Sequence, residues 1–117
     1  MIPFKRTDHI LITVPIGKLS EAQQFYQEVL QLSPIYGDLP QGAIWFRIAD
    51  IELHVMEEET GNSSKRHPAF EVSDLKVAES FLKSKNISIS YSSLIPGRDR
   101  CFFRDPFGNR FELLAFH

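Results

Sequence analysis

Three histidines and one glutamate have the residue types and the spacing of a metal site. His9 and His67 are 58 residues apart (67 − 9), and His54 and Glu112 are separated by the same interval (112 − 54). Imidazole nitrogens and carboxylate oxygens are suitable donors for Zn, Ni, Mn, Fe or Co. So few protein ligands leave positions open for substrate oxygens, where a metal acts as a Lewis acid. We therefore expect these four side chains to hold one divalent metal ion.

The fourth of these ligand positions has a rival. Glu52 lies two residues before His54, and side chains two residues apart on a strand share a face. His54 alternates with the apolar pair Leu53 and Val55, so its side chain is expected to face away from theirs. The shared offset with Glu112 favours His54 as the ligand, and Glu52 is the alternative.

The pattern of apolar residues predicts one order of elements twice over: a strand, a helix and three strands. Runs of apolar and β-branched residues indicate strands, and apolar residues at helical spacing indicate helices. The first half has a predicted strand at 9–14, a helix at 21–32 with Ser20 as its N-cap, a turn at 37–42 and a hairpin at 43–57. The second half has a strand at 67–72, a helix at 75–85 capped by Ser73 or Asp74, and strands at 87–94, 100–104 and 111–116.

Other residues obey the same offset, which indicates an internal repeat. The further pairs are Val14 with Val72, Lys18 with Lys76, and Glu21 with Glu79. A pseudo-twofold relation between the halves would bring both first strands and both last strands around one centre. We expect one domain over residues 1–117, made of module one (1–57), a polar linker (58–66) and module two (67–117).

Composition excludes several classes of protein. A length of 117 residues suits one compact domain, and a net charge of −2 gives no basic surface for nucleic acid or anionic membranes. Cys101 is the one cysteine, which excludes an internal disulfide and fits a reducing compartment. We find no signal-peptide pattern and no run near the roughly 20 apolar residues that span a bilayer. These features predict a cytoplasmic protein.

Five segments together resemble the vicinal-oxygen-chelate superfamily, which includes glyoxalase I, fosfomycin-resistance thiol transferases, extradiol dioxygenases and bleomycin-resistance proteins. They are DHILITV, AQQFYQEVLQL, IELHV, RHPAFEVSDL and FFRDPFGNRFELL, and the last is the most specific. The resemblance implies an α+β fold. Two βαβββ modules related by pseudo-twofold symmetry would form a cupped, eight-stranded mixed sheet around a metal. It also implies a homodimer.

The resemblance carries over residue by residue to three ligands. His9 and His67 match the ligands on the first strand of each module, and Glu112 matches the ligand on the final strand. His54 stands where glyoxalase I carries a glutamate, a departure that weakens the likeness to glyoxalase I itself. The remaining His, His, Glu set is that of the fosfomycin-resistance type.

The sequence therefore predicts a metal-dependent enzyme acting on a small oxygenated metabolite, of lyase, isomerase, thiol transferase or dioxygenase type. Glu112 would double as ligand and catalytic base. Arg100, beside the closing hairpin, would clamp a substrate carboxylate or phosphate, and Trp45 and Phe102 would line the cup. The alternative is a metal-free, bleomycin-resistance-like protein that binds a small molecule. Whether one chain or a dimer completes the site stays open.

Overall fold

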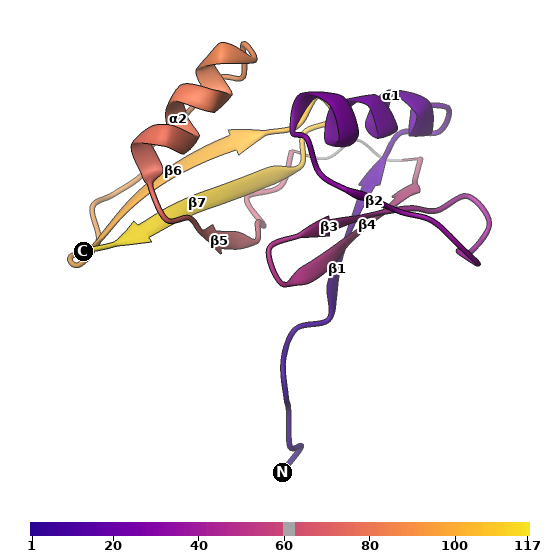
Figure 1. Ribbon diagram of the computed structural model, residues 1–117, viewed down its shortest axis with the longest axis horizontal. Helices are drawn as coiled ribbons and strands as arrows, with labels where there is room; N and C mark the ends of the chain where they lie inside the picture. The colour runs from indigo at the N-terminus through magenta and orange to yellow at the C-terminus, as the bar shows by residue number, and fades with distance from the viewer. Residues whose placement is uncertain (60–62) are drawn as a thin grey trace. The chain divides into compact units, whose positions relative to one another are not determined.

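The computed structural model describes residues 1–59 and 63–117, and it divides into two compact units, Met1–Gly61 and Asn62–His117. The division falls inside the predicted linker at 58–66. Residues 60–62 of that linker lie outside the described residues. Figure 1 shows the helices and strands of each unit.

Unit 1 is a four-stranded mixed sheet with one helical segment. The sheet order is β1-β4-β3-β2; β1 and β4 run parallel, and the other neighbours run antiparallel. The elements are β1 (His9–Val14), α1 (Leu19–Gln24), the π-helix η1 (Phe25–Val29), β2 (Pro34–Ile35), β3 (Ile44–Ile48) and β4 (Ile51–Glu57). The predicted first strand and the predicted hairpin are both present.

The helical segment of unit 1 begins earlier and ends earlier than the sequence predicts. Lys18 occupies the N-cap position without a side-chain cap bond, because a lysine side chain has no acceptor atom. Its amide donates to the Pro15 carbonyl in a turn that leads into the helix. The segment finishes as a π-turn, and Gln31 adopts a left-handed conformation with φ 62°. Ser20 is therefore not the N-cap, and the helix stops before residue 32.

The core of unit 1 lies between this helical segment and one face of the sheet. Leu53 and Val55 of β4 are fully buried, as are Phe46 of β3 and Tyr26 of η1. The Tyr26 and Phe46 rings lie 5.8 Å apart, centroid to centroid. Alternation along β4 then places His54 on the opposite face of the sheet.

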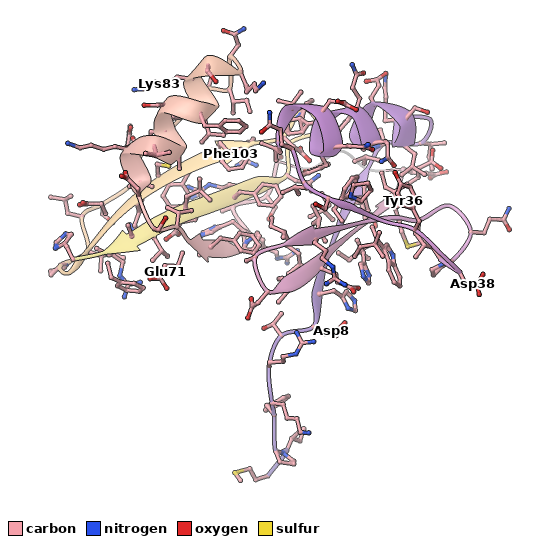
Figure 2. The ribbon with its side chains drawn as sticks, viewed as in Figure 1. Asp8, Tyr36, Asp38, Glu71, Lys83 and Phe103 are labelled. Carbon is pink, nitrogen blue, oxygen red and sulfur yellow. The ribbon has the colours of Figure 1, made fainter. Side chains whose placement is uncertain are left out.

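Unit 2 is a three-stranded mixed sheet with one longer helix. The sheet order is β5-β7-β6, with β5 parallel and β6 antiparallel to β7. The elements are β5 (Ala69–Glu71), α2 (Leu75–Ser84), β6 (Arg98–Arg104) and β7 (Arg110–Phe116). Figure 2 shows Phe103 on the side of β6 that faces α2, and its ring stacks on Phe111 at 5.3 Å.

The parallel strand pairs of the two units have the same register at the predicted offset. Leu11 pairs with His54 in unit 1, and Ala69 pairs with Glu112 in unit 2. Both partners are displaced by 58 residues (69 − 11 and 112 − 54). Equivalent backbone positions in the two sheets therefore carry His54 and Glu112.

The sheet of unit 2 lacks one strand that the sequence predicts. Within residues 87–94, strand pairing is limited to an isolated bridge from Ser90 to Phe102. The carbonyl of Ser93 instead accepts a hydrogen bond from Nη2 of Arg100 at 2.6 Å, so a side chain uses an acceptor that a strand ladder would need. The described residues thus form two mixed sheets of four and three strands with two α-helices.

Helices in the described ranges are short. The longest is α2, with ten residues. None of the helices within residues 1–59 and 63–117 has the length and apolarity to cross a membrane.

Of the two predicted caps for α2, Asp74 makes the bond: its carboxylate accepts from the amide of Val77 at 3.1 Å. Replacing a capping aspartate by alanine typically costs about 1 kcal/mol. We expect Asp74→Ala to lower the free energy of unfolding by about this amount in urea titrations. Ser73→Ala is the matched control and should leave it unchanged. Equal losses in both variants would contradict this assignment of the cap.

Candidate metal centre

Two of the predicted ligands meet within unit 2. Nε2 of His67 lies 3.0 Å from Oε1 of Glu112, although 45 residues separate them in the chain. His67 precedes β5, and Glu112 sits on β7 where Ala69 pairs with it. The parallel pairing of β5 with β7 thus places the carboxylate beside the imidazole. The side chain of Glu112 is only 7% exposed.

The hydrogen bonds of His67 make this pair well suited to a cation. Nδ1 of His67 lies 2.9 Å from the carbonyl oxygen of Lys65, and a carbonyl only accepts, so Nδ1 donates. Nη1 of Arg110 is farther from Nδ1, at 3.4 Å. A neutral ring that donates from Nδ1 has a lone pair on Nε2, and that lone pair then faces a carboxylate oxygen, another acceptor. A proton or a metal ion between the two atoms resolves this conflict.

The separation also fits one ion. Metal bonds to imidazole nitrogen and carboxylate oxygen are each about 2.0–2.2 Å long, so two ligand atoms at 3.0 Å can share an ion at roughly a right angle. A backbone carbonyl that fixes the other ring nitrogen is the usual support for a ligating histidine. The donor atoms of His67 and Glu112 therefore fit a divalent metal.

Two arginines and a phenylalanine surround the His67–Glu112 pair. Nη1 of Arg100 lies 3.5 Å from Oε1 of Glu112. The guanidinium of Arg110 lies 4.1 Å from the centre of the Phe102 ring, and that ring also meets His67 edge-on at 5.2 Å. Phe102 is 2% exposed, so its ring is buried where it packs against His67 and Arg110. Arg100 and Phe102, both predicted to contact substrate, thus lie against the ligand pair.

The other two predicted ligands meet within unit 1. The rings of His9 and His54 are stacked, with centroids 4.0 Å apart and planes 15° from parallel. Trp45 stacks on His54 at 3.8 Å, nearly parallel. These two aromatic contacts build one stack of three rings, Trp45–His54–His9. Trp45, the third predicted substrate contact, is part of it.

The stack restricts how its two imidazoles can bind. The lone pair of an imidazole nitrogen lies in the ring plane, and two nearly parallel planes 4.0 Å apart do not meet within a bond length of about 2.1 Å. As arranged, either His9 or His54 can reach a given ion, and the other must first rotate.

Hydrogen bonds distinguish the two rings. Nδ1 of His9 lies 2.9 Å from Oδ2 of Asp8, and this bond lowers the pKa of Asp8, which keeps the carboxylate ionised as an acceptor. His9 therefore donates from Nδ1 and keeps Nε2 for a metal. Nε2 of His54 instead lies 3.0 Å from Oε1 of Glu52. Glu52, the rival ligand, pairs directly with His9 across β1 and β4.

The four predicted ligands thus occur as two pairs, one in each unit. Among the residues that the structure describes, three or more His, Cys, Asp or Glu side chains do not cluster as a metal site. The groups that orient the ligands, Asp8, the Lys65 carbonyl and Arg110, were not predicted. Asp8 had a sequence signal, since it directly precedes His9. A backbone carbonyl has none.

The one cysteine lies in the core of unit 2. Cys101 is fully buried on β6. Burial, with smaller contributions from the charges of Glu79 and Glu112, raises the pKa of its thiol to about 11. A buried thiol with a raised pKa is a poor nucleophile. Cys101 is therefore a small core residue of unit 2.

Comparison with known protein families gives a match over most of the chain. The family model described as Glyoxalase/Bleomycin resistance protein/Dioxygenase superfamily matches residues 6–113. A search of curated proteins found no match.

Solved structures give the same result. The chain is similar to a glyoxalase family protein from Bacillus anthracis, with 30% identity, complete coverage of both chains and a TM-score of 0.85. It shares its fold with a lactoylglutathione lyase from Agrobacterium tumefaciens, at 18% identity, 97% and 96% coverage and a TM-score of 0.77. It also shares its fold with TnmS3, an antibiotic binding protein from Streptomyces sp. CB03234, at 17% identity, complete coverage of both chains and a TM-score of 0.73.

The reactivity of the Cys101 thiol tests whether this side chain is packed in the core of unit 2. A pKa raised from 9.0 to about 11 leaves about a hundredfold less thiolate at pH 8 than an exposed cysteine has. Reaction with a thiol-specific disulfide reagent at pH 8 should be at least that much slower in the native protein than in guanidinium. Equal rates in the two conditions would show that the thiol is accessible in the folded state.

Proposed function

The chain belongs to the Glyoxalase/Bleomycin resistance protein/Dioxygenase superfamily, and on this basis we propose that it is a divalent-metal-dependent enzyme acting on a small oxygenated metabolite. The proposed reaction is of lyase, isomerase, thiol transferase or dioxygenase type. Family membership does not choose among these, because one fold supports many chemistries.

One observation carries this proposal: the contact between His67 and Glu112. Nε2 of His67 lies 3.0 Å from Oε1 of Glu112, on a carboxylate that is almost completely buried, and a proton or a metal ion between the two atoms would stabilise the pair. Arg100 lies at 3.5 Å from the same oxygen and compensates part of the charge. A buried carboxylate without enough positive charge is strongly disfavoured.

The proposed ligand set joins the two pairs. His67 and Glu112 come from unit 2, and His9 comes from unit 1 with Nε2 free. His54 is the fourth proposed ligand, and it would bind after leaving the ring stack. Glu52 is the alternative fourth ligand, in which case His54 stays in the stack and holds the Glu52 carboxylate by the 3.0 Å contact.

The metal, one of Zn, Ni, Mn, Fe or Co, would supply Lewis-acid polarisation of two neighbouring substrate oxygens. Glu112 is the proposed catalytic base. Its two described contacts, from His67 and Arg100, both go to Oε1, which leaves Oε2 to take a proton from the substrate. Arg100 would orient an anionic substrate group. Trp45 and Phe102 would wall the site and limit the access of water.

The architecture proposed around this site is that of the superfamily. The matching registers of β1–β4 and β5–β7 support a pseudo-twofold relation between two βαβββ modules and a shared, cupped eight-stranded sheet. We propose a homodimer, with the site completed either within one chain or across two.

Size-exclusion chromatography at two protein concentrations tests the homodimer. We expect the elution volume of a dimer, and a monomer at both concentrations would exclude the homodimer.

Metal content tests the proposal. Protein purified without a histidine tag should hold close to one equivalent of a transition metal. Glu112→Ala should lose it, because the variant removes a ligand and its charge. Glu71→Ala, an exposed carboxylate on the neighbouring strand β5, is the matched control and should retain the metal. If the parent holds none, even after reconstitution with each of the five ions, the metal-free small-molecule-binding alternative replaces the enzyme.

A second pair of variants identifies the fourth ligand. If His54 binds, His54→Ala should weaken metal affinity by about 10- to 100-fold or more, and Glu52→Ala should have a smaller effect. The reverse order would assign the position to Glu52. Iron retained at full stoichiometry in both variants would indicate a His9, His67, Glu112 facial set and favour dioxygenase chemistry. Competition with a chromogenic chelator gives the affinities.

A further inference from the structure

Unit 2 contains a cavity of about 400 Å³ whose lining includes Arg100 but none of the proposed metal ligands. It lies between the first half of α2 and residues 91–100. Its apolar lining comes from Leu75, Tyr91, Leu94 and Ile95, and Leu94 is almost fully exposed at its mouth. A volume in this range is typical of small-molecule pockets, which combine apolar walls with a few polar groups.

Specific interactions hold the walls of this cavity in place. The Tyr91 hydroxyl donates to the Glu79 carboxylate, which ties the segment after Ser90 to α2. The Ile95–Arg98 bridge closes a tight turn in which Gly97 has φ +87°, a conformation that glycine adopts without strain. The bond from Arg100 to the Ser93 carbonyl fixes the middle of the segment. The cavity is therefore a formed pocket.

Arg98, at the start of β6, is an unusual part of the lining. Its Nε is buried and has no hydrogen-bond partner within residues 1–59 and 63–117. The one described contact of its guanidinium is with the Phe116 ring, at 4.7 Å. Buried donors in native proteins are nearly always paired, and a guanidinium presents a planar fork suited to a carboxylate or phosphate. An unpaired Nε on a residue that lines the cavity is a donor for which the described residues supply no acceptor, and an occupant of the cavity could supply one.

Among the charged residues of the lining, Lys76, Arg98 and Arg100 outnumber Glu79 and Asp99 by one, so the pocket has a net positive charge. Lys76, on the first turn of α2, has no ion pair among the described residues. Both carboxylates are engaged: Glu79 accepts from Tyr91, and Asp99 lies 3.5 Å from Nε2 of His117. Lys76 and Arg98 are therefore the cations available to an occupant.

We propose that this cavity is a binding site for a small amphipathic oxyanion, a carboxylate or phosphate carrying a short apolar chain. The head would lie against Arg98 and Lys76, and the chain would pack on Leu75 and Leu94. This site does not depend on the proposed metal. The two are connected by Arg100, which lines the cavity and also lies 3.5 Å from Glu112.

NMR titration of ¹⁵N-labelled protein in the presence of a chelator tests this site without any metal. Hexanoate and hexyl phosphate are the probes, and hexanol carries the same chain without charge. At least one anion should saturably shift the Arg98 Nε–H resonance and the amides of residues 75–79 and 91–98. The stronger of the two probes identifies the head group. Hexanol should bind at least tenfold more weakly, because it lacks the charge-assisted bonds.

Variants then locate the binding. Arg98→Gln and Lys76→Gln should each weaken the stronger probe by about tenfold or more. Lys83→Gln is the matched control: Lys83 is on the same helix, is exposed, and projects away from the sheet in Figure 2. The proposal would be overturned if hexanol bound as tightly as the anions. It would also be overturned if the affinity for the stronger probe stayed unchanged in both Arg98→Gln and Lys76→Gln. Wild-type shifts that do not saturate or that fall outside these segments would overturn it as well.

Discussion

The parallel pairing of the first and last strands of each unit determines where the chemistry of this protein can occur. Backbone hydrogen bonds align β1 with β4 and β5 with β7 in one register. Because strand side chains alternate, the faces that carry Leu53 and Phe111 into the cores leave His54 and Glu112 on the opposite faces. A slip of one residue would exchange these faces. It would expose the cores, so burial of the apolar side chains also fixes the position of the polar ones.

Burial of Glu112 leaves a charged group poorly solvated in unit 2. A carboxylate with a 7% exposed side chain must be compensated, and the described cation nearest to it, Arg100, stands at the long distance of 3.5 Å. His67 is closer, but its ring donates to the Lys65 carbonyl from the other nitrogen. When His67 is neutral, these groups compensate the carboxylate incompletely. Such an arrangement suits a site that gains a cation, and this links the packing of the sheet to the proposed function.

The sequence was sufficient for features that depend on periodicity. It predicted the hairpin of unit 1, the helix after Asp74, and the approach of His67 to Glu112. It failed where a competing contact decides the outcome. Residues 87–94 have the composition of a strand, but Arg100 takes the Ser93 carbonyl. The stacking of His9 on His54 depends on rotamers, and the support of His67 depends on a backbone atom. Neither has a pattern in the sequence.

We propose that histidines from both halves of the chain bind the same ion, and X-ray absorption spectroscopy of the metal-loaded protein would show whether they do. Multiple scattering from imidazole rings counts the histidine ligands. We expect at least two imidazoles in the parent protein, and one fewer in each of His9→Ala and His67→Ala. An imidazole count that does not change in His9→Ala, or a spectrum with oxygen ligands alone, would contradict it.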